Sequence, residues 1–290
     1  MSIIQIQNFT KYYGKSRGVI DLNLEVKDKD FFGFIGPNGA GKSTTIRYLL
    51  GLIKATSGQA RIFGKDCTTD STSILEDIGY MPAEAMFYND MKVQDLIKLS
   101  ANLHRKDCSK EAKDLCDRFQ LDIKKKICEL SLGNRKKVSI ICALQHTPQL
   151  YILDEPTSGL DPLMQKEFFD VLTKRNKEGA TVFLSSHVLN EIKRYCNNAA
   201  IIREGKLIAH STVYELSKSD TKKISVYGIT SLPTLPGASK VEYASDHISF
   251  LYQGLVPDLL QALHGLSITD ISITNLDLDE IFMHFYESVS

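Results

Sequence analysis

The segment from residue 31 to residue 50 places a glycine-rich loop between an apolar run and a helix. Phe31–Ile35 is short and almost uninterrupted in its apolar character, which is typical of a buried strand. The next nine residues, 36–44, read GPNGAGKST and fit the pattern Gly-x4-Gly-Lys-Ser/Thr. Lys42–Leu50 then has helical periodicity and ends at Gly51, a common helix stop. This order of elements predicts an α/β fold with a phosphate site at the loop.

The residue types of the loop indicate how a nucleotide would be held. Glycines allow successive backbone N–H groups to curl around phosphate oxygens at the positive end of a helix. Lys42 would neutralise the β- and γ-phosphates, and the Ser43 hydroxyl would be a ligand of Mg²⁺. The alternative is a glycine-rich turn that only caps the helix. The residues expected to contact nucleotide here are Gly36, Asn38, Gly39, Ala40, Gly41, Lys42, Ser43 and Thr44.

Two further strands are expected to end in groups suited to phosphate chemistry. Leu150–Leu153 leads into Asp154 and Glu155, whose side chains should point in different directions because strand side chains alternate. Asp154 suits a Mg²⁺ shell, directly or through a water, and Glu155 suits the activation of an attacking water. His187 follows the strand 181–185 and is positioned to bond a γ-phosphate. An acidic pair that starts a loop and an ordinary packed or surface histidine are the alternatives.

The rest of the chain indicates two domains. Alternating apolar residues before position 27 predict antiparallel strands, and the pattern from about 84 to 148 changes to helices. Strands near 150 and 181, separated by a helix, are typical of a parallel sheet, and a hairpin over 201–210 closes this unit. Residues 217–290 read as a small α+β domain that ends in a helix from Asp277. That domain either has its own role or only stabilises the first.

These motifs resemble those of the nucleotide-binding subunits of ATP-binding cassette (ABC) transporters over about residues 3–216. Leu130–Arg135, LSLGNR, stands in place of the family's signature Leu-Ser-Gly-Gly-Gln, and Ser158–Asp161 matches the D-loop. The resemblance implies a P-loop NTPase cassette with a mixed sheet, an antiparallel β subdomain and a helical subdomain. It implies that Lys42, Glu155 and His187 are catalytic. It also implies nucleotide contacts from Tyr13, Ser131, Gly133 and Asp161, with Ser131 and Gly133 acting across a head-to-tail dimer.

The sequence departs from the family pattern at two motifs. Leu132 and Asn134 replace a glycine and a glutamine of the signature, which would loosen the approach of the backbone to a partner's phosphate. At the Q-loop, Ala83 stands where glutamine is expected and cannot ligate a metal, although Glu84 is adjacent. We therefore expect a slower or differently coupled ATPase, while Glu155 and His187 argue against an inactive site.

Charge and composition exclude several classes of partner. The 35 Lys and Arg residues equal the 35 Asp and Glu residues, so no basic excess favours nucleic acid. The basic runs at 124–126 and 135–137 are expected to be solvated helix ends. The six cysteines have no zinc spacing, and the N-terminus has no signal-peptide pattern. No run is long and apolar enough to span a membrane, so we expect a cytoplasmic chain. The resemblance implies that it reaches the inner face of the membrane through a separate permease.

The C-terminal residues narrow the resemblance to one branch. Asn275–Tyr286 is similar to the Ser-Leu-Glu-Glu-Ile-Phe ending of bacterial ATPases that serve drug, antimicrobial-peptide and ion exporters. The expected partners are a permease and a second copy of the chain or a paralogous ATPase. A soluble ABC protein that acts on ribosomes or DNA is the alternative, but this chain has one cassette and no sustained heptads. A GTPase or kinase is disfavoured because no Asn-Lys-x-Asp motif occurs.

Overall fold

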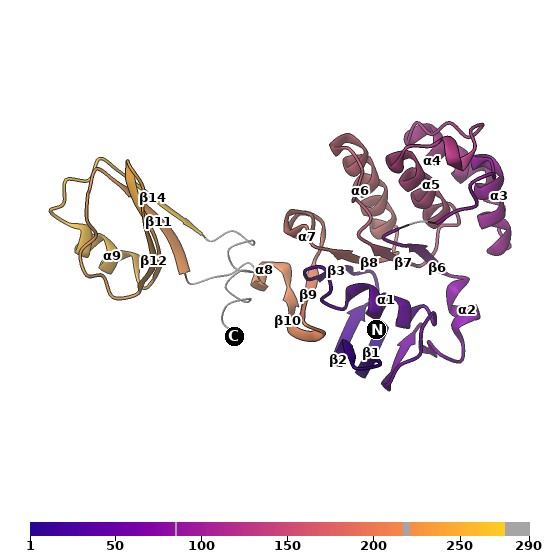
Figure 1. Cartoon of the computed structure of the whole chain (residues 1–290), viewed down its shortest axis with the longest axis horizontal. Helices are drawn as coiled ribbons and strands as arrows, with labels where there is room; N and C mark the ends of the chain where they lie inside the picture. The colour runs from indigo at the N-terminus through magenta and orange to yellow at the C-terminus, as the bar shows by residue number, and fades with distance from the viewer. Residues whose placement is uncertain (85, 217–220, 276–290) are drawn as a thin grey trace. The chain divides into compact units, whose positions relative to one another are not determined.

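The computed structural model describes residues 1–84, 86–216 and 221–275 of the 290-residue chain. The chain divides into two compact units, Met1–Val213 and Tyr214–Ser290 (Figure 1). The division predicted from the sequence, at 216/217, lies three residues further along. Among the described residues, no helix is both long and apolar enough to cross a lipid bilayer.

The first unit is built around a mixed sheet of six strands in the order β10-β9-β3-β8-β7-β6, counted over the described residues. The strands β3, β6, β7, β8 and β9 run parallel to their neighbours, and β10 closes the edge as the antiparallel arm of a hairpin with β9. The three central strands, β3, β8 and β7, are buried along their whole length. Their bounds are Phe31–Ile35 (β3), Ile78–Met81 (β6), Leu150–Asp154 (β7), Thr181–Ser186 (β8), Asn198–Arg203 (β9) and Lys206–Thr212 (β10).

A second, antiparallel sheet lies on the other side of helix α1, in the order β2-β1-β4-β5 (Figure 1). Side chains of α1 (Lys42–Leu49) fill the space between the two sheets, because Ile46 and Leu49 belong to the same buried cluster as Phe9 and Phe32. The ring of Phe9 stacks on Tyr48 with centroids 4.1 Å apart. These strands are Ser2–Tyr13 (β1), Ser16–Lys27 (β2), Ser57–Ile62 (β4) and Lys65–Asp66 (β5).

Helices cover the remaining faces of the first unit. The helices α3, α4 and α5 gather at one end of the unit and form the predicted helical subdomain, while α6 and α7 lie beside β8 (Figure 1). The helices α5 and α6 begin at polar residues, Ser131 and Asp161, whose side chains accept a hydrogen bond from the first turn. The bounds are Ser71–Leu75 (α2), Val93–Leu103 (α3), Ser109–Arg118 (α4), Leu132–Leu144 (α5), Pro162–Lys177 (α6) and Leu189–Tyr195 (α7), with a 3-10 turn at Ile127–Glu129.

The second unit has its own small core. Four antiparallel strands in the order β12-β13-β11-β14 pack one face against helix α9, with Val226, Phe250 and Leu259 fully enclosed. The short helix α8 leads into this unit from β10. The helix predicted from Asp277 lies outside the described residues. The bounds are Val213–Leu216 (α8), Thr221–Tyr227 (β11), Ala238–Tyr243 (β12), His247–Gln253 (β13), Val256–Leu263 (α9) and Asp270–Asn275 (β14).

Two histidines join the helical subdomain to the central sheet. The ring of His104, just after α3, stacks on His146, just after α5, with centroids 3.6 Å apart. His146 Nε2 lies 3.1 Å from the carbonyl oxygen of Ile78 at the start of β6. Burial and the neighbouring His104 lower the pKa of His146 to about 4. Burial also lowers the pKa of His104.

We expect this histidine pair to make the first unit sensitive to acid. The pKa of His146 is lower in the folded chain than the ~6.5 of an unfolded histidine, so its contribution to stability is complete above pH 6.5 and is lost as the pH falls toward 4. Between pH 7 and pH 4.5 the melting temperature of His146→Gln should fall less than that of the wild type, by about 2–4 °C. Calorimetry of the full chain measures this, with His264→Gln at an exposed position as the control. Equal losses for wild type and His146→Gln would contradict it.

Candidate functional site

Close packing of the glycine loop shapes the space at the N-terminus of α1. A Cβ atom on Gly36 would lie 2.3 Å from the carbonyl oxygen of Ile202, so no larger residue fits there. Gly41 has a φ of 110°, a conformation that side chains rarely allow, and it precedes the helix without any side-chain cap. The hairpin β9–β10 supports the loop because the Gly205 N–H donates to the Ala40 carbonyl at 2.9 Å. The uncapped helix end leaves N–H groups for an anion.

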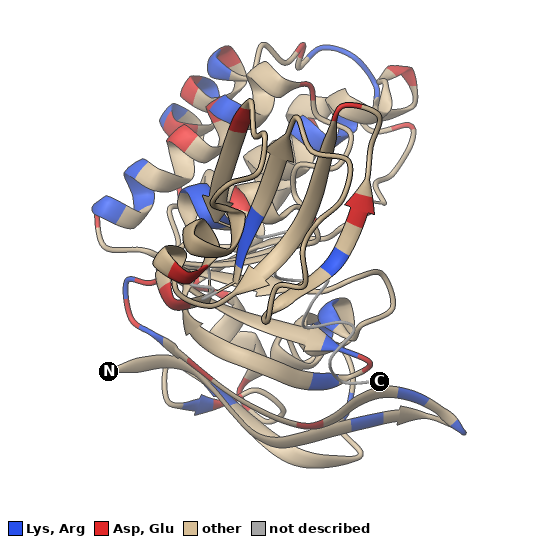
Figure 2. Ribbon diagram, turned by 90° about the vertical axis from the view of Figure 1, so that its left-hand side faces the viewer, with Lys and Arg blue, Asp and Glu red and all other residues tan. Residues whose placement is uncertain are grey.

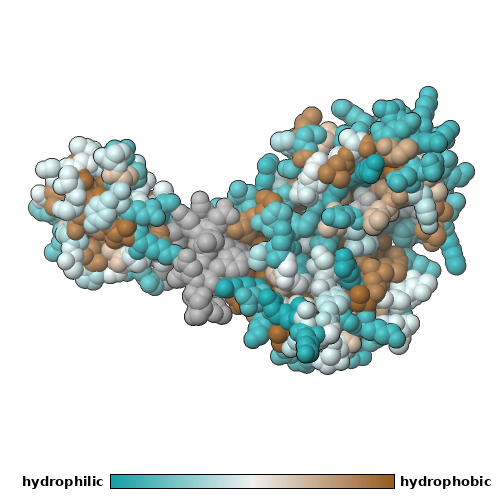
Figure 3. Space-filling view, viewed as in Figure 1, coloured by the Kyte–Doolittle hydropathy of each residue, from teal (hydrophilic) through white to brown (hydrophobic). Residues whose placement is uncertain are grey.

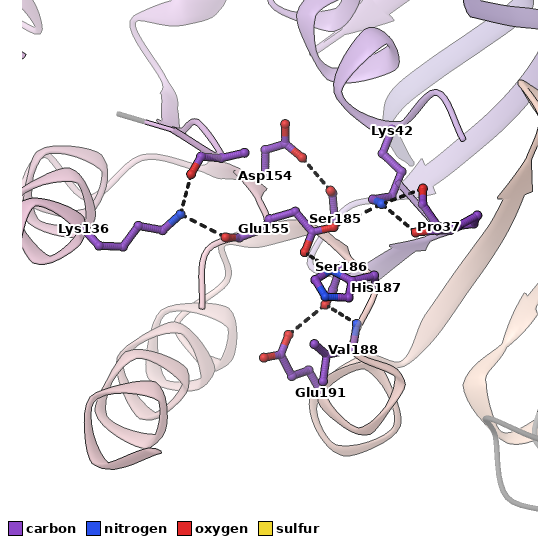
Figure 4. Close-up of polar contacts among 12 residues, drawn as sticks. Pro37, Lys42, Lys136, Asp154, Glu155, Ser185, Ser186, His187, Val188 and Glu191 are labelled. Carbon is purple, nitrogen blue, oxygen red and sulfur yellow. Dashed lines mark hydrogen bonds and ion pairs between the residues drawn. The ribbon is translucent and has the colours of Figure 1, made fainter. Parts of the chain in front are cut away.

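Parallel pairing brings three predicted catalytic residues to one edge of the sheet. The last residue of β3, Ile35, pairs with Ser186, and Asp154 at the end of β7 pairs with Ser185. The residues that follow these pairs, at the carboxyl ends of the strands, therefore lie side by side. Figure 4 shows Lys42, Glu155 and His187 meeting there.

The Glu155 carboxylate lies between two groups that can be positively charged. Its Oε1 is 3.1 Å from the Lys42 ammonium, an ion-pair distance without hydrogen-bond geometry, and its Oε2 is 2.7 Å from His187 Nδ1. The Lys42 ammonium also donates hydrogen bonds to the carbonyls of Gly36 at 2.6 Å and Pro37 at 3.2 Å. Lys42 is buried and His187 is exposed, so the arrangement opens toward solvent on the histidine side.

Asp154 has surroundings different from those of Glu155, as strand alternation predicts. Its carboxylate accepts a hydrogen bond from the Ser185 hydroxyl at 2.7 Å, and its side chain is only 3% exposed. A buried carboxylate with free lone pairs is an oxygen donor of the kind that Mg²⁺ prefers. Ser43, the other residue expected to bind metal, lies on the first turn of α1 and is partly exposed. The donor set therefore fits a hard divalent cation.

The loop of His187 is held by a second carboxylate. The Ser186 hydroxyl donates to Glu191 at 2.9 Å and accepts from the Val188 N–H at 2.9 Å (Figure 4). Burial raises the pKa of Glu191. These bonds fix the backbone on both sides of His187, so its ring has a defined starting position. Sequence reasoning did not identify Ser186 or Glu191, because serine before a histidine carries no recognised motif.

The expectation that the basic run 135–137 is solvated is wrong for Lys136. The basic run 135–137 was predicted to be a solvated helix end, but Lys136 is only 5% exposed. Its ammonium donates to the carbonyl of Ala83 at 2.8 Å and to that of Glu155 at 3.0 Å (Figure 4). Burial lowers the pKa of Lys136, while the carboxylates of Asp154, Glu155 and Glu84 act against that shift. Helical spacing was the available signal, because Lys136 lies four residues before the buried Ile140 and so shares its face.

The signature segment and the D-loop lie next to each other. Ser131 caps α5, with its hydroxyl accepting from the Asn134 N–H at 3.4 Å, and Asp161 caps α6 by accepting from the Met164 N–H at 3.0 Å. A Cβ on Gly133 would lie 3.1 Å from the carbonyl oxygen of Gly159, so the two loops are close. No hydrogen bond or ion pair between described residues joins Ser131, Gly133 or Asp161 to the Lys42 cluster. All three residues are exposed or half-exposed.

Tyr13 lies at the end of β1 with its ring exposed, and the Lys11 ammonium is 5.2 Å from the ring centroid. An exposed ring at a strand end is available for stacking on a planar base.

The views in Figures 2 and 3 show no large surface patch that is uniformly charged or uniformly hydrophobic among the described residues. Lysine and arginine alternate with acidic residues over the ribbon in Figure 2, in agreement with the neutral total. Hydrophobic and hydrophilic residues are mixed on the visible face of the first unit in Figure 3. Large exposed apolar side chains nevertheless occur beside the functional loops, with Leu132 75% and Leu163 60% exposed. Recognition at this site therefore depends on local groups rather than on a broad electrostatic field.

Known proteins are similar to this chain in both sequence and fold. The family model described as ABC transporter matches residues 19–158. The bacitracin transport ATP-binding protein BcrA of Bacillus licheniformis is 40% identical over 225 residues, which cover 76% of this chain and 73% of that protein. An uncharacterized ABC transporter ATP-binding protein of Methanocaldococcus jannaschii is 34% identical, over 74% of this chain and 79% of that protein.

Solved structures agree with this assignment. The ATP-binding subunit of an ABC transporter superposes with a TM-score of 0.70 at 27% identity, covering 74% of this chain and 91% of that one. A dimeric cassette in a post-hydrolysis state, bound to ADP and Pi, has a TM-score of 0.65 at 22% identity, over 72% of this chain and 98% of that one, and supports the fold alone. The mixed sheet, antiparallel subdomain and helical subdomain expected from the sequence are confirmed. The chain belongs to the ABC transporter ATP-binding proteins, a family of subunits that bind and hydrolyse ATP.

Proposed function

We propose that this chain binds Mg-ATP at the loop 36–44, pairs with a second cassette and uses hydrolysis to drive export through a separate permease. The observation that carries the proposal is the meeting of Lys42, Glu155 and His187 beside the uncapped end of α1. This arrangement supplies an anion site, a base and a polar group for the γ-phosphate within one edge of the sheet.

Nucleotide binding would change the partners of Lys42. In the structure its ammonium is bonded to two carbonyls and lies against Glu155. The β- and γ-phosphates carry more negative charge than a single carboxylate, so they attract the ammonium away from Glu155. The carboxylate is then free to accept a hydrogen bond from the attacking water, and the His187 ring is close enough to orient both. Binding thus prepares the site for hydrolysis.

Mg²⁺ would be held by the Ser43 hydroxyl and by Asp154, directly or through a water. The buried Asp154 carboxylate receives one hydrogen bond, from Ser185, which keeps it oriented while other lone pairs remain available. When bound, the ion neutralises charge on the β- and γ-phosphates. The residues expected around the nucleotide are those of the loop together with Tyr13, whose exposed ring supports adenine stacking.

A second copy or a paralogous cassette would complete each site. Ser131 and Gly133 stand at the positive end of α5, beside the D-loop and outside the Lys42 cluster, which supports a role for them at a nucleotide held by a partner. The exposed Leu132 and Leu163 give the same face an apolar contact. Loss of the γ-phosphate removes charge from between the two chains, and the pair opens.

Export rather than import is proposed from the C-terminal sequence, and the relative from Bacillus licheniformis is named for bacitracin transport. The C-terminal sequence 275–286 resembles exporter ATPases, although residues 276–286 lie outside the described part of the chain. In this proposal residues 1–216 are the ATPase domain, with a helical subdomain at about 84–148, and 217–290 are an accessory domain. The chain would lie on the inner face of the membrane, bound to its permease.

The role of Lys42 can be tested by equilibrium binding. Lys42→Ala removes the ammonium that would leave Glu155 for the phosphates, and a charge-assisted bond of about 1.5–3 kcal/mol corresponds to a roughly 10- to 100-fold weaker Kd for ATP. Lys54→Ala, at an exposed position after α1, is the matched control and should bind as the wild type does. A Kd for Lys42→Ala within threefold of the wild-type value would contradict the proposed role.

The role of Glu155 can be tested by trapping the dimer. Glu155→Gln keeps the shape of the side chain but removes the base, so turnover should fall by about 10²–10⁴ while ATP still binds. The variant should then elute as a dimer in size-exclusion chromatography with Mg-ATP and as a monomer with Mg-ADP. Glu178→Gln, on the surface after α6, serves as the control. A monomer at saturating Mg-ATP would contradict the homodimer form of the proposal.

The transport assignment can be tested by identifying what binds the chain in cells. The full chain purified from detergent-solubilised membranes should bring with it a polypeptide that contains transmembrane helices, and Lys54→Ala should recover it equally. Mass spectrometry of the purified material identifies the partner. Recovery of ribosomes without such a polypeptide would overturn the proposal in favour of a soluble ABC protein.

A further inference from the structure

We infer that Lys136 is a positioning residue that holds Glu155 in place for catalysis and ties it to the signature helix α5 and to Ala83. The inference rests on the proposed function of Glu155 as the group that activates water. The ammonium of Lys136 is the point where three segments meet: α5, the end of β6 with the residues after it, and the end of β7. Its two bonds are drawn in Figure 4.

The backbone at Glu155 needs such support. Its φ is 47°, in the left-handed region that is unfavourable for a non-glycine residue. On one side the Glu155 N–H is fixed by the Ser185 carbonyl at 3.1 Å. On the other side the Glu155 carbonyl accepts from Lys136 at 3.0 Å, a shorter contact than the 3.4 Å bond from the Ser158 N–H. Lys136 therefore stabilises the peptide group that sets the direction of the Glu155 side chain.

The burial of Lys136 has a cost that packing alone does not explain. Transferring an ammonium from water to the protein interior is strongly unfavourable unless partners compensate for the lost hydration. No salt bridge within 4.0 Å involves Lys136 among the described residues, and its two hydrogen-bond acceptors are neutral carbonyls. The carboxylates of Asp154, Glu155 and Glu84 attract the ammonium from beyond that distance and offset only part of the cost, because burial still lowers the pKa of Lys136. An apolar residue at this helical position would fill the space without that cost. The lysine is better explained by the geometry it imposes than by stability.

The second acceptor of Lys136 connects this geometry to a segment that departs from the family pattern. Ala83 has no side-chain group that could reach a metal or water, but its carbonyl is bonded to Lys136 at 2.8 Å. Movement of the residues around Ala83 therefore pulls on the same ammonium that holds the Glu155 carbonyl. Since Lys136 lies on α5, five residues after Ser131, movement of the signature segment acts on it too. Lys136 thus links the chain's own base to the helix end that serves a partner's nucleotide.

The test compares turnover with nucleotide binding in the purified full chain. Lys136→Met keeps most of the side-chain volume but has no donor, so kcat should fall at least tenfold while the Kd for ATP changes less than threefold. Lys136→Arg restores a charged donor and should recover at least a third of wild-type kcat. The neighbouring Lys137→Met is the matched control on the same helix and should stay within twofold of wild type in both quantities.

A double-mutant cycle separates positioning from a purely structural role. If Lys136 acts through Glu155, adding Lys136→Met to Glu155→Gln should lower the residual kcat by less than a further twofold, because the group being positioned is already gone. A full additional tenfold loss would show that Lys136 acts independently of Glu155 and would overturn the inference.

Each remaining outcome also decides the question. If Lys136→Met loses ATP affinity, the Kd for ATP and the kcat of Lys136→Gln are measured in the same way. If both variants lose as much affinity as kcat, Lys136 has a structural role and the inference is overturned. Wild-type kcat in Lys136→Met would overturn it as well. Failure of the wild type itself to hydrolyse ATP would contradict the proposed function instead, so the two failures are distinguishable.

Discussion

The parallel pairing of β3, β8 and β7 is the constraint on which the site depends. Because these strands run in the same direction and are paired in register, the residues that follow them emerge at one edge of the sheet. The Lys42 ammonium and the His187 ring come from segments far apart in the chain, yet one lies 3.1 Å and the other 2.7 Å from the Glu155 carboxylate. A slip of one residue in either pairing would turn Glu155 away from Lys42.

Much of this arrangement was predictable because the central elements have strong local patterns. Phe31–Ile35, the loop after it and α1 could be placed from apolar runs and glycine spacing, and the divergence of Asp154 and Glu155 followed from strand alternation. The burial of Lys136 was not predicted, because a basic residue near a helix start is usually solvated and its acceptors are carbonyls supplied by Ala83 and Glu155, distant in sequence. Every residue has a main-chain carbonyl, so the sequence does not indicate which carbonyls accept a hydrogen bond from a buried lysine. The three-dimensional structure is needed to identify them.

The neutral charge of the chain is compatible with binding a polyanion because the attraction is short-ranged. The attraction would come from the buried Lys42 ammonium and from the N–H groups at the uncapped start of α1. Each of these electrostatic interactions is stronger there than on the protein surface, because less water screens it. The Lys42 ammonium and the Glu155 carboxylate also form an ion pair at 3.1 Å, so neither charge is left unpaired. Lys42 and Glu155 therefore compensate each other's charge, and phosphate would replace the carboxylate as the partner of the ammonium.

The hairpin β9–β10 gives the phosphate loop a mechanical connection to the rest of the chain. Its turn donates to Ala40, the Ile202 carbonyl closes the space behind Gly36, and β10 continues directly into the residues that join the first unit to the second. Any tension along that covalent tether enters the first unit at β10, one strand away from the wall of the nucleotide site. A load applied to the tether is met first by the β10–β9 ladder, at the pair Thr212–Asn198, and the turn that contacts the phosphate loop lies at the far end of the same hairpin.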